Sequence, residues 1–97
     1  MQYKRNYSKR NYNALERTIK GFANHRRIQI LDLLKFYPEL SLSEISEALN
    51  INLKTASEHL RRLAIAGLIL KRHSGYAVRH KLSPKAKIVL SFLRKLE

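Results

Sequence analysis

A run of polar side chains that could hydrogen-bond to a nucleic acid lies in the second half of the chain. Its members are Asn52, Lys54, Thr55, Ser57, Glu58, Arg61 and Arg62. The run is interrupted at helical spacing by the apolar row Leu53, Ala56, Leu60 and Leu63. The segment 52–66 is therefore expected to be a helix with a buried row and an outward polar face. Cations and hydroxyl groups on such a face can contact phosphates and base edges in the major groove of double-stranded DNA.

The members of this face are expected to differ in their contacts. Three polar residues lie early in this helix: Lys54, Thr55 and Ser57. Two of the three are expected to contact base edges or phosphates. The alternative is that all three lie on a solvated helix face. Arg61 and Arg62 are expected to contact phosphates. Glu58 could accept a hydrogen bond from a cytosine amino group, but an ion pair with Arg62 or Arg61 on the same helix is favoured. His59 falls between the two rows and is expected to pack rather than to contact a base.

A cationic β-hairpin is predicted directly after this helix, over 68–82. Two strands flank Ser74-Gly75, and a two-residue loop there would pair His73 with Tyr76. A three-residue loop, which shifts the register by one, stays open. The residues near its tip are expected to contact the DNA backbone or the minor groove; they are Lys71, Arg72, His73 and Ser74.

The charge of the chain points to a polyanionic partner. Twenty lysines and arginines stand against seven aspartates and glutamates, a net charge of +13 on 97 residues. Residues 1–20 carry +5, residues 21–50 carry −1 and residues 51–97 carry +9. Residues 1–13 contain the tandem repeat KRNYS-KRNYN and are read as a basic arm, with a frayed terminus as the alternative. The arm's candidate DNA contacts are Lys4, Arg5, Lys9 and Arg10.

Five helices are expected to position these groups. Apolar periods and capping residues predict helices over 14–22, 25–36, 43–50, 53–66 and 84–96, and a brief strand at 40–42. The expected N-caps are Asn13 (with Glu16 reaching back), Asn24, Ser43, Asn52 and Ser83. Gly21 is expected to weaken the end of the first helix, and Gly67 to close the fourth. The predicted fold is mostly α with a small β-hairpin: a winged helix-turn-helix domain over 14–97, with five helices plus a wing.

Three runs of the sequence resemble the ArsR-type winged-helix repressors. They are GFANHRRIQIL at 21–31, LSEISEALNINLKTASEHLRRL at 42–63 and AGLI at 66–69. The resemblance covers about residues 15–96, and its middle part is fairly specific, although MarR-like proteins share some of it. It implies a homodimeric transcription repressor with 52–62 as recognition helix and the hairpin as wing. The first and last helices would form the dimer interface, through Leu15, Ile19, Phe22, Val89, Phe92, Leu93 and Leu96.

The apolar face of the last helix supports a partner surface independently of the resemblance. It is wider than a surface helix of so small a monomer should show, and such a face usually needs a second surface to cover it. Metal sensing is not carried over from the family, because 42–49 lacks a thiol and 86–96 lacks carboxylates and histidines. No metal site and no cofactor is expected, and the effector is left open.

Several function classes are excluded by composition. The chain has no cysteine, so disulfides and thiolate chemistry are ruled out, and no apolar stretch approaches the length of a bilayer span. No signal-peptide pattern, Gly-rich phosphate loop or catalytic constellation occurs, so an enzyme is not expected. The expected location is the cytoplasm, in association with the nucleoid. Two alternatives stay open: a non-specific architectural DNA-binding protein, and a protein-binding scaffold that uses Glu39, Glu44 and Glu47.

Overall fold

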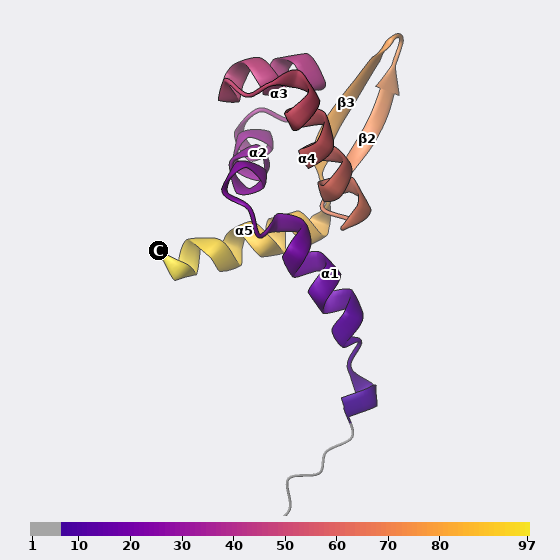
Figure 1. Cartoon of the computed structure of the whole chain (residues 1–97), viewed down its shortest axis with the longest axis vertical. Coiled ribbons are helices and arrows are strands. Elements are labelled where there is room, and N and C mark those ends of the chain that lie inside the picture. The colour runs from indigo at the N-terminus through magenta and orange to yellow at the C-terminus, as the bar shows by residue number, and fades with distance from the viewer. Residues whose placement is uncertain (1–6) are drawn as a thin grey trace, which may run out of the picture.

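A computed structural model of the chain describes residues 7–97 (Figure 1). A short 3-10 turn is followed by five α-helices and a small three-stranded sheet. In chain order the elements are the 3-10 turn Tyr7–Lys9, α1 Tyr12–Phe22, α2 His25–Phe36, β1 Leu40–Ser41, α3 Leu42–Leu49, α4 Leu53–Ile65, β2 Ile69–Ser74, β3 Ala77–Leu82 and α5 Pro84–Leu96. The predicted fold class is confirmed. In residues 7–97, no helix combines the length and the apolar content that crossing a bilayer requires.

Three helices begin at the expected capping residues. Asn24 accepts hydrogen bonds from the backbone of Arg26 and Arg27, which starts α2. Asn52 accepts from Lys54 and Thr55 at 2.8 and 3.3 Å and starts α4. The N-cap of α5 is Ser83, whose hydroxyl accepts from Ala86, and Pro84 occupies the first helical position. Gly67, at φ +73°, follows the last turn of α4 as expected.

Two predicted helix starts are wrong by one or two residues. The N-cap of α1 is Asn11, whose side chain accepts from Ala14 at 2.9 Å, and not Asn13. The N-cap of α3 is Ser41, and not Ser43. Ser41 and Glu44 exchange two hydrogen bonds, at 2.9 and 3.2 Å, in a capping box. A box at Ser43 would need a glutamate or glutamine three residues on, where the chain has a serine, so the earlier start satisfies one more backbone donor.

The core lies between α2, α3, α4, α5 and the sheet. Its fully buried large side chains are Ile30, Leu31, Leu34, Ile45, Leu63 and Leu68. One residue of the predicted buried row does not face inward. Leu53 is half exposed because the first turn of α4 extends beyond the core. The buried row of α4 therefore begins at Ala56.

The hairpin has a register that differs from both predicted ones. Ser74 pairs with Ala77 and Lys71 with His80, so the two-residue loop is Gly75-Tyr76. Gly75 has φ +62°, and a two-residue loop that needs a positive φ at its first position favours glycine there. Compared with the predicted loop Ser74-Gly75, the loop therefore lies one residue further along the chain, and the strand register is shifted by two residues. β1 adds to the other edge of β3, which gives the strand order β1-β3-β2.

His80 joins the hairpin to β1. The imidazole is buried, and its Nδ1–H donates to the Leu40 carbonyl at 2.9 Å. Burial lowers the pKa of His80 below 6.5, and Lys71, its cross-strand neighbour, acts in the same direction; the Leu40 carbonyl opposes both. The folded protein therefore binds a proton here less readily than the unfolded chain does.

Acidification is expected to destabilise the protein through this histidine. Because the pKa is lowered on folding, its contribution is complete above pH 6.5 and is lost as the pH falls toward the folded-state pKa. Urea unfolding between about pH 7.5 and about pH 5.5 should show a falling midpoint, above the range where the carboxylates titrate. The His80→Leu variant should show a smaller fall. An identical pH dependence in both proteins would contradict the assignment.

Gly21 is a contact point between helices. α1 continues through it to Phe22, and a Cβ at Gly21 would collide with the Cβ of Ala66, at the end of α4. The Gly21→Leu substitution is expected to lower the free energy of unfolding by about 1–3 kcal/mol through overpacking. Urea denaturation measures the loss. Asn13→Leu, at an exposed position of the same helix, is the control, and equal stability of the two variants would refute the contact.

Candidate nucleic-acid interface

The polar face predicted for residues 52–62 is outward in the structure. All seven of its members are exposed, while Ala56, Leu60 and Leu63 on the other side of α4 are buried. We call these seven residues the α4 face; they are Asn52, Lys54, Thr55, Ser57, Glu58, Arg61 and Arg62. In Figure 1, α4 lies beside the β2–β3 hairpin, with α3 packed across its first half. The groups predicted to contact DNA from the helix and from the wing are thus brought together.

The turn between α3 and α4 holds the two helices at a fixed angle. Asn50 adopts the left-handed conformation, at φ 51° and ψ 51°, and ends α3. The Ser46 hydroxyl then donates to the Ile51 carbonyl at 2.6 Å, across the turn. Only Asn50, Ile51 and Asn52 separate the two helices, so this bond limits their relative movement.

Glu58 pairs with both arginines of the α4 face. Its two carboxylate oxygens accept from Nε and Nη2 of Arg61 at 3.0 and 2.7 Å, and one of them also accepts from Arg62 Nε at 3.1 Å. These bonds, those of Arg61 first, lower the pKa of Glu58 from 4.5 to about 2. The favoured role, an ion pair within the helix, is confirmed. The pair holds both guanidinium groups along the helix and reduces their net charge.

Removal of Glu58 is expected to raise the affinity for duplexes of any sequence. The Glu58→Ala variant gains one net positive charge beside two released arginines. The slope of log K against log salt should therefore steepen by about 1. Salt titrations monitored by fluorescence anisotropy measure this. Glu47→Ala on α3 makes the same charge change at another exposed position, and equal slopes in the two variants would show that Glu58 does not restrain the arginines.

A contact between Arg27 on α2 and His59 on α4 supports α4 on the side of the helix that faces the rest of the domain. Arg27 Nη1 lies 3.5 Å from His59 Nδ1, and Arg27 Nη2 donates to the Lys20 carbonyl on α1 at 3.5 Å. Burial lowers the pKa of His59, and Arg27 and Arg62 add to the effect. The imidazole is therefore neutral at pH 7, and its Nδ1 can accept from Arg27. His59 packs between rows, as expected, and through Arg27 it links α4 to α2 and α1.

The wing tip is exposed, but its cationic side chains are not equally available for contact with DNA. Lys71, Arg72, His73 and Ser74 all face solvent. Arg72, however, donates through Nε and Nη2 to the two carboxylate oxygens of Glu39 at 2.6 and 2.9 Å. Lys71 and His73 form no ion pair within residues 7–97. Of the lysine and arginine near the wing tip, Lys71 is thus the one without an ion pair in residues 7–97, a distinction that depends on a contact 33 residues away in sequence.

Two of the three glutamates that suggested a protein-binding scaffold already form contacts within the chain. Glu39 is held by Arg72, and Glu44 forms the capping box and lies 3.7 Å from Arg79. In the described part of the chain, Glu47 is the one of the three without such a pairing. This finding removes most of the support for the scaffold alternative.

The described part of the basic arm, residues 7–13, lies away from the α4 face. Lys4 and Arg5 fall outside the described residues. Lys9 ends the 3-10 turn, and the guanidinium of Arg10 stacks over the Tyr12 ring, 5.9 Å from its centroid. In Figure 1 this segment continues from the far end of α1, opposite the hairpin tip. Within one chain, then, the arm's described cations are not brought together with the α4 face and the wing.

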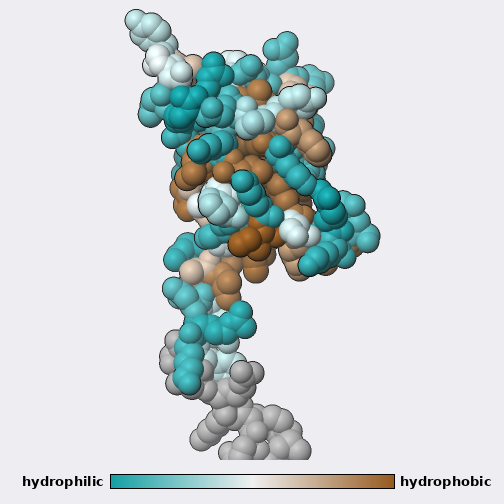
Figure 2. Space-filling view, turned by 180° about the vertical axis from the view of Figure 1, so that it is seen from behind, coloured by the Kyte–Doolittle hydropathy of each residue, from teal (hydrophilic) through white to brown (hydrophobic). Residues whose placement is uncertain are grey.

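An exposed apolar surface covers parts of α1 and α5. Leu15, Ile19, Phe92 and Leu96 are 42–65% exposed, and Leu93 is half-buried. Phe22 and Val89, predicted for the dimer interface, are instead buried in the chain's own core. Ile88, which is not among the predicted interface residues, is the most exposed of the apolar residues on α5, at 71%. Figure 2 shows apolar surface gathered across the middle of the molecule.

Two helices joined by a tight turn, with a cationic hairpin beside the second, define a winged helix-turn-helix DNA-binding domain. Residues 24–71 match the model of the arsR family of bacterial regulatory proteins. The transcriptional activator HlyU of Vibrio cholerae is 35% identical over 79 residues, which cover 80% of this chain and 72% of HlyU. The chain belongs to the arsR family of bacterial regulatory proteins and is a transcription regulator.

Two mycobacterial proteins are also similar. An HTH-type transcriptional regulator of Mycobacterium tuberculosis is 45% identical over 56 residues, 58% of this chain, and the match spans only 24% of that protein. A homodimeric winged helix-turn-helix DNA-binding domain from Mycobacterium bovis superposes with a TM-score of 0.79 at 30% identity. The superposition covers 99% of this chain and 88% of the M. bovis domain. The match therefore includes α1 and α5 as well as the family's central segment.

Proposed function

We propose that the chain is a sequence-specific regulator that binds double-stranded DNA as a homodimer. Helix 52–66 reads the major groove, and the wing 68–82 contacts the backbone or the minor groove. The observation that carries the proposal is the α4 face. It offers seven polar side chains outward, on a helix fixed by a short turn. The hairpin beside it carries Lys71, which forms no ion pair in residues 7–97. A helix of this kind fits the major groove, which is about 12 Å wide.

The proposed division of the chain is a basic arm over 1–13 and a DNA-binding domain over 14–97. α1 and α5 serve as dimerisation elements, because their exposed apolar residues need a covering surface. The homodimeric state of the M. bovis domain supports this assignment. Two copies of the α4 face would then meet successive major grooves, about 34 Å apart. The proposed contact residues on the arm are Lys4, Arg5, Lys9 and Arg10.

Repression is the proposed sense of regulation, since a dimer bound across a promoter blocks access of polymerase. The HlyU relative is called an activator, so the sign needs its own test. A promoter that carries the selected binding site, fused to a reporter gene, should lose expression when the chain is produced. A gain in expression would make the protein an activator. The proposed location is the bacterial cytoplasm, on the nucleoid.

A non-specific architectural role is the second candidate, favoured by the net charge of +13 and the basic arm. Deletion of residues 1–10, which leaves the Asn11 cap of α1 in place, separates the two candidates. Under the specific role, the truncated chain keeps its preferred duplex and loses only part of its affinity. Under the architectural role, most binding disappears with the arm. Anisotropy titrations with a labelled duplex measure both.

A further inference from the structure

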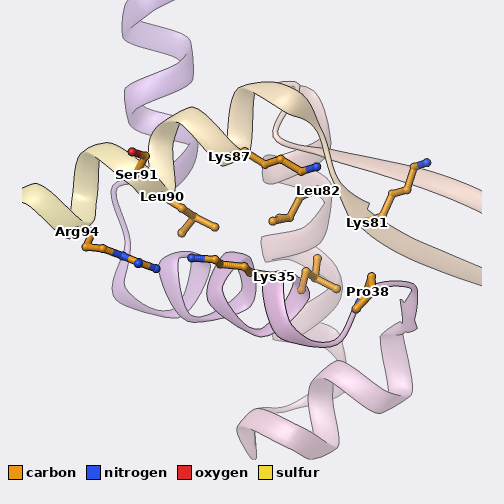
Figure 3. A pocket seen from close by; sticks show the side chains of 9 residues that line it. Lys35, Pro38, Lys81, Leu82, Lys87, Leu90, Ser91 and Arg94 are labelled. Carbon is orange, nitrogen blue, oxygen red and sulfur yellow. The ribbon is translucent and has the colours of Figure 1, made fainter.

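A cavity of about 610 Å³ lies between α2, α5 and the end of β3 (Figure 3), and its lining shares no residue with the α4 face, the wing tip or the exposed apolar surface of α1 and α5. Its volume is in the range of small-molecule sites. The walls include the apolar side chains of Leu34, Pro38, Leu82 and Leu90. Leu34 and Leu90 are themselves buried in the core, so the base of the cavity is a fixed part of the fold.

Four of the other five lining residues are cations from three separate elements: Lys35, Lys81, Lys87 and Arg94. The fifth is Ser91, and no carboxylate lines the cavity. Figure 3 shows Lys35 and Arg94 extending toward one another from α2 and α5, with Lys87 lying above Leu82. Lys81 extends outward from the strand, so Lys35, Lys87 and Arg94 form the inner group.

Unlike Arg61, Arg62 and Arg72, the cations around the cavity are not paired with carboxylates in the described part of the chain. Arg61, Arg62 and Arg72 each hold a carboxylate. In residues 7–97, by contrast, none of the four cations around the cavity forms an ion pair. The Lys35 ammonium lies 5.7 Å from the centroid of the Phe36 ring. Like charges gathered around an apolar depression repel one another, and a bound anion would relieve that repulsion.

The cavity is separate from the apolar surface proposed for dimerisation. On α5 the lining residues fall at 87, 90, 91 and 94, the spacing of one helix side. The exposed apolar residues Ile88, Phe92 and Leu96 repeat every four residues on the other side. A second copy packed on those three residues therefore leaves the cavity side of α5 accessible.

We propose that this cavity binds a small amphipathic organic carboxylate. The apolar body of the ligand covers Leu34, Leu82 and Leu90, while Lys35, Lys87 and Arg94 surround its carboxylate. The size and the mixed lining favour a medium-chain aliphatic acid over a free inorganic anion, which would leave the leucines exposed. The site does not depend on DNA binding.

Calorimetric titration of the full chain with decanoate, without DNA and below the micelle-forming concentration, tests the proposal. One decanoate should bind per chain, and decanol, which has the same apolar body without the charge, should bind at least about tenfold more weakly. Arg94→Glu should weaken decanoate binding at least about tenfold. Lys95→Glu makes the same charge change one residue further on, outside the lining, and should leave binding unchanged.

A second variant fills the cavity without changing the charge. Ser91 is exposed, so Ser91→Phe should preserve the fold, which circular dichroism checks, and should abolish decanoate binding. Three results would each overturn the proposal: no binding of decanoate to the unaltered chain, equal binding of decanol, or equal weakening by Arg94→Glu and Lys95→Glu. Binding that persists in a folded Ser91→Phe variant would also place the ligand elsewhere.

Discussion

Phe92→Asp is expected to make the chain monomeric and to lower its affinity for a duplex with two half-sites by at least about a hundredfold. Phe92 is 52% exposed, between Ile88 at 71% and Leu96 at 65%, one turn away on either side. Dimerisation would bury all three, and a carboxylate in their midst would be desolvated without a partner. Two linked α4 faces bind cooperatively, because the second contact becomes intramolecular once the first has formed.

The exposed position of Phe92 makes the experiment interpretable. Because the ring contributes little to the buried core of the chain, the variant should keep its fold, which circular dichroism checks. Tyr37→Asp is the matched control, since it replaces another exposed aromatic side chain, outside α1 and α5, with the same charge. Light scattering gives the mass of each variant. An unchanged dimeric mass for Phe92→Asp would refute the assigned interface, and an unaltered protein that is already monomeric would refute dimerisation itself.

Replacing Lys54 and Thr55 together with alanine is expected to remove most of the preference for a particular base sequence. Both side chains are exposed in the first turn of α4, the part of such a helix that meets base edges. Removing each specific hydrogen bond to a base should reduce discrimination by about 1–3 kcal/mol. Alanine favours helix, and the Asn52 side chain still caps the segment through backbone amides, so α4 should remain folded.

The control for this experiment comes from the wing. Lys71→Ala removes a cation that no carboxylate neutralises within residues 7–97, and it should lower the affinity for all duplexes nearly equally. Arg72 is less suitable, because its removal also releases the Glu39 carboxylate close to the DNA. Competition titrations with preferred and scrambled duplexes distinguish the two effects. If the Lys54→Ala, Thr55→Ala variant retained full discrimination, the first turn of α4 would not be the reading element.

Local patterns predicted most of the fold because most of its signals are local. Asn24, Asn52 and Ser83 are N-caps whose bonds reach only two or three residues ahead. The cap at Ser41 also has a local signal, a serine three residues before Glu44, although Ser43 was the predicted cap. The hairpin register could not be fixed in the same way, because it depends on which residue takes the positive φ of the loop. The exposure of Leu53 depends on where the core ends, which no local pattern shows.

In the candidate site, too, the features set by local sequence could be predicted, and those set by tertiary packing could not. The α4 face and the Glu58 pair follow from helical spacing, so they could be predicted. The pairing of Arg72 with Glu39 and the contact of Arg27 with His59 join residues more than thirty positions apart. The cationic cavity likewise combines α2, β3 and α5. Sequence spacing does not predict such long-range contacts, because they depend on how the helices pack.

Selection of bound duplexes from a random pool tests the central claim most directly, that the outward face of α4 reads a base sequence. The enriched duplexes should carry a near-palindromic site whose half-sites lie about 10 base pairs apart. At about 150 mM salt, the enriched duplex should bind far more tightly than a scrambled one of equal length. Equal affinity for the two duplexes, or a pool that yields no common sequence, would contradict the account.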